Sequence, residues 1–174
     1  RLNLDYDMND NVMLYASATS GHRAGGYNLV FFSKTPTYDP EELIAYELGY
    51  KTQWMDNSLQ LNGSFYFYDY ENIHTVATEV NEFFGTSTSV LPAPGAEIRG
   101  MEAELTWLAT DQLTVGGSFS YTPNEYSEDL FMLDPAGYDR PESLFGATTA
   151  LQNVKGNQLL QVPESKFNGW ATYV

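Results

Sequence analysis

Apolar and polar residues alternate along several stretches of this chain, each long enough for one β-strand. In the clearest stretch, residues 59–68, leucine, glycine and phenylalanine occupy one face, and glutamine, asparagine, serine and tyrosine occupy the other. This period of two is the pattern of a half-buried strand, and no apolar stripe appears at the helical period. The same alternation predicts further strands at residues 2–6, 12–19, 43–54, 98–107, 113–121 and 166–174, the last with undetermined facing.

The connections between these strands alternate between short and long. Short polar turns are predicted at residues 7–11, 55–58 and 108–112, and long irregular segments at 21–41, 72–96 and 123–158. Long loops at every second connection are unusual in a compact soluble domain. They are typical of outer-membrane β-barrels, whose periplasmic turns are short and whose outer loops are long.

The two faces of the strands differ in chemistry. In a membrane barrel the apolar face meets lipid and the polar face lines the interior. The side chains predicted to line that interior are Glu47, Lys51, Asn62, Glu102 and Glu104. The alternative is a secreted β-sandwich that binds carbohydrate, with its aromatic side chains stacking on sugars. In that fold the apolar face would instead pack against a second sheet.

Strand length and ring placement favour the barrel. The strands are longer than the usual soluble length of about 5–6 residues. Trp54 and Trp107 come just before short turns, and Tyr70 and Tyr121 lie toward long loops, as in an aromatic girdle between lipid and water. One apolar band distinguishes the two architectures: Phe65, Phe67, Leu105 and Phe119. In a barrel this band faces outward, and in a sandwich it packs on a second sheet.

Composition narrows the possible functions. Eight lysines and arginines face 23 aspartates and glutamates, a formal net charge of −15, which argues against nucleic-acid binding. There is no cysteine, so disulfide and thiolate sites are excluded. No signal peptide opens the chain and no apolar run suits a membrane helix. We therefore expect the chain to start, and to end, inside a larger structure.

No catalytic or metal-binding motif stands out, so no enzyme activity, metal site or cofactor is expected. His22 and His74 are expected to be solvated loop residues, and Gly25-Gly26 lacks the rest of a phosphate-binding loop. Lining the interior is a simpler role for Glu102 and Glu104 than acid–base catalysis. The acids of the third long segment are expected to be solvated rather than to bind a divalent cation: Glu125, Glu128, Asp129, Asp134 and Asp139.

Three segments taken together resemble the barrel region of TonB-dependent outer-membrane receptors, most closely the siderophore-receptor type. They read YASATSGHRAGGYN, YDPEELIAYELGYKTQWMDNSLQLNGSFYFYDYENI and IRGMEAELTWLATDQLTVGGSFSYTPNEY. The resemblance covers residues 1–126 and continues more weakly through GNQLLQVPESKFN. His22 departs from it, because the family often has phenylalanine there.

The resemblance implies an all-β antiparallel transmembrane barrel of roughly 22 strands, closed by a plug. Residues 1–174 would form part of that barrel domain, about seven strands, without the plug, the energy-coupling box or the last strands. The barrel would lie in the outer membrane of a Gram-negative bacterium, in contact with lipopolysaccharide.

The resemblance also implies uptake of a ferric siderophore or a similar scarce solute, driven by the TonB energy-coupling complex acting through the plug. The ligand contacts expected in the outer loops are Arg23, Tyr27, Tyr38 and residues of segment 72–96, because arginine and tyrosine suit anionic, aromatic chelates. Divalent cations that bridge lipopolysaccharide are a further expected partner of the acidic surface. A passive porin or small adhesion barrel stays open as an alternative.

Overall fold

The described residues form one large antiparallel sheet and two small two-stranded sheets. The computed structural model describes residues 1–29, 33, 35–81, 85–133 and 151–174. Within these residues no helix is long and apolar enough to cross a membrane. The strands are β1 (Leu2–Asn9), β2 (Val12–Arg23), β3 (Gly26–Tyr27), β4 (Thr37–Tyr38), β5 (Glu41–Trp54), β6 (Leu59–Asn81), β7 (Gly85–Thr110), β8 (Leu113–Tyr121), β9 (Asn124–Tyr126), β10 (Phe131–Leu133), β11 (Leu151–Asn153) and β12 (Ser165–Tyr173).

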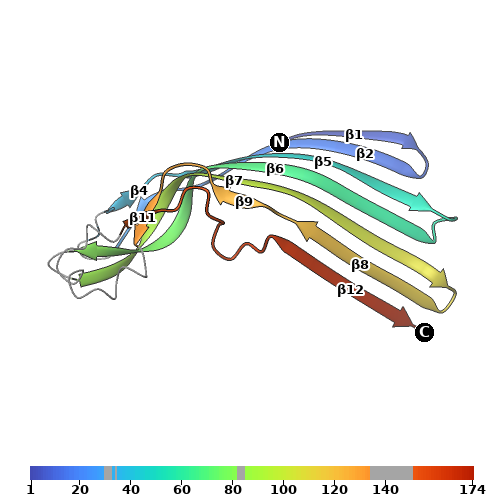
Figure 1. Ribbon diagram of the computed structural model, residues 1–174. Helices are drawn as coiled ribbons and strands as arrows, with labels where there is room; N and C mark the ends of the chain where they lie inside the picture. The colour runs from blue at the N-terminus through green and yellow to red at the C-terminus, as the bar shows by residue number, and fades with distance from the viewer. Residues whose placement is uncertain (30–32, 34, 82–84, 134–150) are drawn as a thin grey trace.

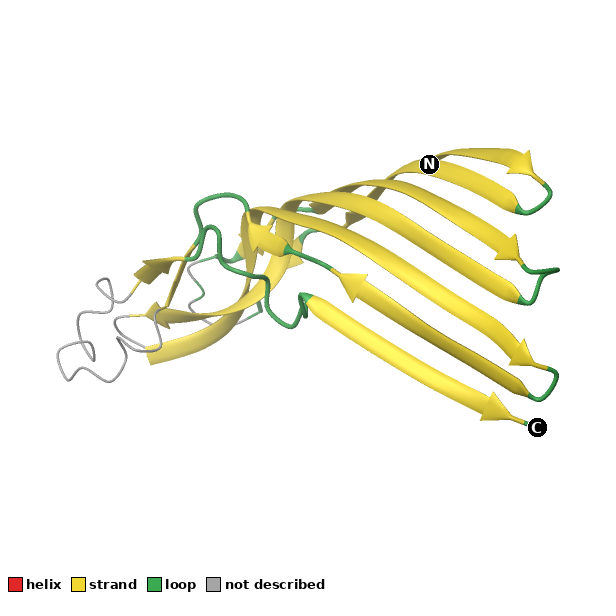
Figure 2. Cartoon of the chain, turned by 45° about the vertical axis from the view of Figure 1, so that its right-hand side comes forward, coloured by secondary structure: helices red, strands yellow, loops and turns green. Residues whose placement is uncertain are grey.

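The large sheet is a curved single layer in which chain neighbours pair with each other. Its order is β1-β2-β5-β6-β7-β8-β12, and β9 pairs with β7 beyond the end of β8. The short turns lie together at one end, and β6 and β7 continue past the other strands at the opposite end (Figure 1). The same layer is seen from another side in Figure 2. We call the end away from the short turns the outer end.

The three short turns are confirmed, although the strands run closer to them than predicted. The first is closed by Asn9, whose side chain accepts a hydrogen bond from the Asn11 N–H at 2.9 Å. The last is closed by Thr110, whose hydroxyl oxygen accepts from the Leu113 N–H at 3.0 Å. Asparagine and threonine side chains form such local turn bonds readily.

The turn between β5 and β6 holds three successive residues in the left-handed region: Met55, Asp56 and Asn57, with φ of 54°, 52° and 67°. Aspartate and asparagine tolerate this conformation because their side chains can hydrogen-bond to nearby backbone, whereas the methionine side chain cannot. We expect Met55→Gly to raise the free energy of unfolding by about 0.5–1 kcal/mol. Urea unfolding in lipid vesicles measures this. The matched control, Met13→Gly at the second residue of β2, should lower stability, and a loss in both variants would contradict the prediction.

Segment 72–96 was predicted to be irregular, and this is wrong. Most of it is the outer part of a long hairpin, in which β6 and β7 pair as far as Asn81 and Gly85. Its threonines and valines favour extended backbone. The prolines are tolerated because this part of β7 lies beyond β8, with less of its second edge in the sheet. Asn72, at φ 54°, and Pro94 fall between paired residues, so the ladder is interrupted there without a change of register.

Segments 21–41 and 123–158 also contain strands that were not predicted. β2 runs on through Arg23, and β3 and β4 form a small hairpin. In the third segment β9, β10 and β11 form, while residues 134–150 lie outside the described residues. The final strand, β12, is confirmed, and its pairing with β8 places Phe167 opposite Phe119, which settles its facing.

A small buried core holds the outer end together. It consists of Ala93, Ala96, Tyr126, Leu130 and Leu159, which join the β6–β7 hairpin to the chain after β8. This core explains why the mostly polar residues 123–133 and 151–162 are held against the hairpin: their few apolar side chains are buried there.

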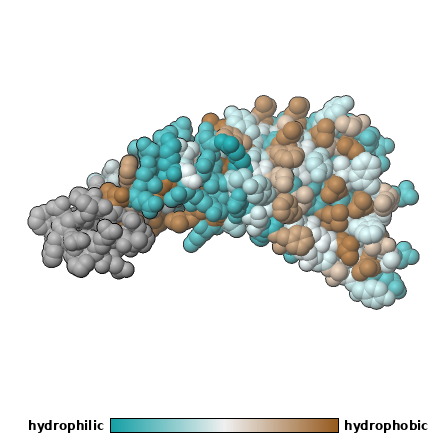
Figure 3. All heavy atoms as spheres, viewed as in Figure 1, coloured by the Kyte–Doolittle hydropathy of each residue, from teal (hydrophilic) through white to brown (hydrophobic). Residues whose placement is uncertain are grey.

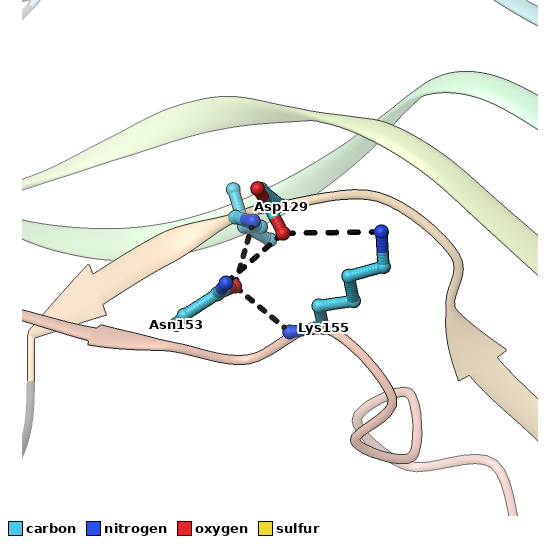
Figure 4. A network of polar contacts seen from close by, with 4 residues as sticks. Asp129, Asn153 and Lys155 are labelled. Carbon is cyan, nitrogen blue, oxygen red and sulfur yellow. Dashed lines mark hydrogen bonds and ion pairs between the residues drawn. The ribbon is translucent and has the colours of Figure 1, made fainter.

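A polar network beside this core ties two parts of the third segment to each other (Figure 4). The Asn153 amide donates to the Asp129 carboxylate at 3.0 Å, and the Asn153 amide oxygen accepts from the backbone N–H of Leu130 and of Lys155. The Lys155 ammonium lies 3.9 Å from the same Asp129 carboxylate. Asp129, one of the acids expected to be solvated, is exposed but paired.

Candidate functional site: the polar face and the outer segments

Strand register gathers the predicted interior residues on one face of the sheet. Lys51 lies opposite Asn62, and Asn62 lies opposite Glu104. One step toward the outer end, Ser64 lies opposite Glu102. Directly opposite residues of an antiparallel pair project from the same face, so the three strands β5, β6 and β7 contribute to a single polar surface.

This surface is hollowed, with a volume of about 440 Å³. All five predicted interior residues line the hollow, together with Tyr15, Lys166 and serines of β6 and β8. Three carboxylates therefore share it with two ammonium groups. In the described part of the chain the Asn62 amide oxygen is buried there without a hydrogen-bond partner. This polar surface therefore keeps one hydrogen-bond acceptor that its own side chains do not use.

Tyr15 and Lys166 are members of this surface that sequence reasoning did not single out. The Tyr15 hydroxyl donates to the Glu47 carboxylate at 2.5 Å and orients it. Lys51 lies 6.0 Å from the centre of the same ring. Tyr15 alternates in step with Ser17 and Thr19, and this pattern could have placed it on the polar face. The position of Lys166 could not be predicted, because it depends on which way β12 faces.

The opposite face carries an apolar band that ends toward the outer end at Arg99, which lies opposite Phe67. Leu48, Phe65 and Met101 lie in one row across three strands, and Leu48 and Phe65 are 59% and 58% exposed. Figure 3 shows apolar side chains gathered over the large sheet, in the part nearer the short turns. Trp54, Leu59 and Trp107 form the row at the turn end. Within the described residues no second sheet covers this face, so the band faces outward, against the sandwich alternative.

The three predicted ligand contacts lie at the outer end in different surroundings. Arg23 is exposed at the end of β2, opposite Glu41, and shares the polar face with Tyr15. Tyr27 is 75% exposed. Tyr38 packs edge-on against the His74 ring, with ring centres 4.8 Å apart. Among the described residues no hydrogen bond joins these three side chains, and their contact with a ligand stays a prediction.

His74 is not a solvated loop residue, as had been predicted. It lies in β6 with its side chain only 4% exposed. Its Nε2 lies 2.8 Å from the Asp39 carbonyl oxygen, and its backbone N–H donates to the Glu41 carboxylate at 2.8 Å. The run of β-branched residues after His74 was the signal that the strand continues. His22, also predicted in a loop, is exposed but belongs to β2.

The acidic residues that lie within the described ranges are not gathered into a metal site. In the part of the chain that the structure describes, no group of three or more histidines and carboxylates is placed to hold a metal ion. Asp134 and Asp139 lie outside the described residues.

A curved antiparallel meander with one polar and one apolar face, and short turns at one end, is the wall of an outer-membrane β-barrel. The chain belongs to the TonB-dependent receptor family, whose β-barrel model, described as "TonB dependent receptor-like, beta-barrel", matches residues 1–174. The family consists of outer-membrane receptors of Gram-negative bacteria, which are transporters and not enzymes.

Solved structures share this wall. The siderophore receptor PiuA from Acinetobacter baumannii is similar over 98% of this chain and 23% of its own length, with a TM-score of 0.67 and 17% identity. The ferric yersiniabactin uptake receptor FyuA from Yersinia pestis covers 97% of this chain and 22% of its own, with a TM-score of 0.66 and 16% identity.

The copper transporter OprC is similar over 72% of this chain and 20% of its own, with a TM-score of 0.59 and 18% identity. This chain therefore spans less than a quarter of the length of these receptors. At such identities the likeness shows the shared fold alone.

Proposed function

We propose that the receptor to which this wall belongs takes up a ferric siderophore, or a similarly scarce solute, with energy from the TonB system. The observation that carries the proposal is the ordered structure at the outer end. The β6–β7 hairpin, residues 123–133 and 151–162, and the β3–β4 hairpin are joined by packing and hydrogen bonds rather than left as loose loops. A capture surface needs such fixed geometry, because ordering loops on binding would lower affinity.

The parts of the chain have separate roles in this proposal. Arg23 and Tyr27 are exposed at the outer end, where a guanidinium and a phenol suit an anionic, aromatic chelate. The polar face with Glu47, Glu102 and Glu104 lines the path inward. Coupling to the TonB complex runs through a plug within the barrel, and the outer ends of the strands meet lipopolysaccharide and its bridging cations.

The siderophore as the transported solute is a more specific proposal than TonB-dependent uptake itself. Among the similar structures are a siderophore receptor, a ferric yersiniabactin uptake receptor and a copper transporter. The wall therefore suits more than one solute, and the loops decide which one is bound.

Uptake by cells that produce the receptor tests the proposal. Deleting the gene should abolish energy-dependent uptake of at least one radiolabelled ferric chelate from a panel of catecholate, hydroxamate and phenolate types. Uptake should also stop when the proton gradient is collapsed. Uptake that survives loss of the gradient would indicate a passive porin, and no loss for any ferric chelate would indicate another solute.

Single substitutions locate the contacts within the same assay. Arg23→Gln and Tyr27→Ala should each raise the KM for uptake, because each removes one outer contact. Tyr6→Ala is the matched control, since Tyr6 is an exposed tyrosine on the apolar face of β1. An equal effect of all three variants would contradict the assignment of these contacts.

A further inference from the structure

Asn28 connects two outer segments that are far apart in sequence. Its side-chain amide donates to the Val90 carbonyl oxygen at 2.9 Å, and its amide oxygen accepts from the Val90 N–H at 2.8 Å. One side chain thus bonds to both backbone groups of a β7 residue, as a neighbouring strand would. The segment before β5 is thereby attached to the β6–β7 hairpin.

Asn28 also holds its own segment in shape. The same amide nitrogen donates to the Thr35 carbonyl oxygen at 2.6 Å, and the Asn28 backbone N–H donates to the Pro36 carbonyl oxygen at 2.9 Å. Both strands of the small β3–β4 hairpin are therefore tied to the same residue that contacts β7.

A second attachment lies nearby. The Glu79 carboxylate accepts hydrogen bonds from the hydroxyls of Ser33 and Ser89 at 2.8 and 2.9 Å, and also from the Thr35 hydroxyl. Ser89 is almost completely buried. Glu79 therefore holds the part of the segment around Thr35, whereas Asn28 is the attachment point next to Tyr27.

The inward direction of the Asn28 side chain determines the direction of the side chains on either side of it. Successive side chains of an extended chain point to opposite sides. With Asn28 half-buried against β7, Tyr27 and Leu29 point outward, and they are 75% and 96% exposed. An exposed aromatic and an exposed aliphatic side chain are thus presented two positions apart on a backbone that is held on both sides.

We propose that Asn28 is a positioning residue, which fixes Tyr27 and Leu29 on the outer surface for first contact with the solute. The identity of the solute rests on the proposed function, whereas the positioning itself does not. Loss of the Asn28 amide should release the backbone around Tyr27 while leaving the barrel wall and its coupling intact.

Spin-label distances test the positioning without any ligand. The chain has no cysteine, so in a receptor with any cysteines elsewhere replaced by serine, Leu29→Cys and Thr88→Cys provide labelling sites on exposed residues of the two segments. In the receptor in its outer membrane we expect a narrow distance distribution, which Asn28→Ala should broaden. Asn28→Asp, which keeps only the acceptor for the Val90 N–H, should give an intermediate width. An unchanged distribution in Asn28→Ala would overturn the proposal.

Uptake kinetics test the consequence for binding. With the radiolabelled ferric catecholate, hydroxamate and phenolate chelates, Asn28→Ala should raise KM by about tenfold. This is the effect expected when one or two hydrogen bonds that hold the binding surface in place are lost. The maximal rate should stay unchanged. Asn9→Ala, an exposed turn residue at the opposite end of the sheet, is the matched control.

A fall in maximal rate with unchanged KM would overturn the proposal, because Asn28 would then act on transport rather than on capture. If none of the chelates is taken up, the proposed function fails, and the spin-label distances still decide whether Asn28 positions Tyr27.

Discussion

Phe119→Arg is expected to lower the free energy of unfolding of the receptor in lipid by about 2–4 kcal/mol, the cost of arginine at the middle of the lipid-facing surface of a barrel. Phe119 is 39% exposed on the apolar face, between Ala103 of β7 and Phe167 of β12. Its row lies midway between the tryptophan row at the turn end and the outer end of the apolar band. A guanidinium there would replace a ring that lipid solvates well.

Ser118→Arg is the matched control, one residue away on the opposite face. Ser118 is exposed and lies directly opposite Glu104, so an arginine there meets water and an acidic neighbour. Urea unfolding in phospholipid vesicles, followed by tryptophan fluorescence, compares the two variants. An equal or larger loss for Ser118→Arg would mean that the assignment of the two faces is reversed.

Gly49→Ala is expected to lower the free energy of unfolding by about 1–3 kcal/mol, the usual cost of overpacking. Gly49 lies directly opposite Tyr15, whose ring covers it, and a Cβ added to Gly49 would be 2.4 Å from the Tyr15 ring carbon Cζ. The ring would have to move, and the hydrogen bond from Tyr15 to Glu47 would be lost with it. The same arrangement of a ring over an opposite glycine recurs at Tyr50 and Gly63, Tyr66 and Gly100, and Trp170 and Gly116.

A double-mutant cycle separates the clash from a general effect on the strand. Adding Tyr15→Ala to Gly49→Ala should make the combined loss smaller than the sum of the single losses, because the clash requires both side chains. Gly21→Ala serves as control, since a Cβ at Gly21 would meet no atom within 4 Å. Additive losses would show that the ring does not constrain Gly49.

Much of the wall follows from local pattern. The alternation at residues 59–68 predicts both the strand and its facing, because side-chain direction in a strand depends only on parity. The polar clusters at Asn9–Asn11 and at Met55–Ser58 predict the turns for an equally local reason, since these side chains bond to their own backbone. The seven strands on the main path of the large sheet, the chemistry of its two faces and the barrel class could all be predicted in this way.

The outer end could not be predicted in this way. The hairpin over 72–96 was missed because serine, threonine, proline and glycine are also loop residues, and only pairing between β6 and β7 decides the outcome. His74 was placed in solvent because its burial depends on Asp39 and Glu41, more than thirty positions earlier. The attachment of Asn28 to Val90 spans 62 positions and has no sequence signal of its own.

The sequence by itself determined the alternating strands, the short turns and the two chemically distinct faces, because each arises from interactions within a few residues. Only the tertiary structure decided the register that joins Lys51, Asn62 and Glu104, the facing of β12 and the packing of the outer segments. These depend on which distant backbone and side-chain groups meet, and hydrogen bonds and buried area between distant segments leave no periodic trace in the chain.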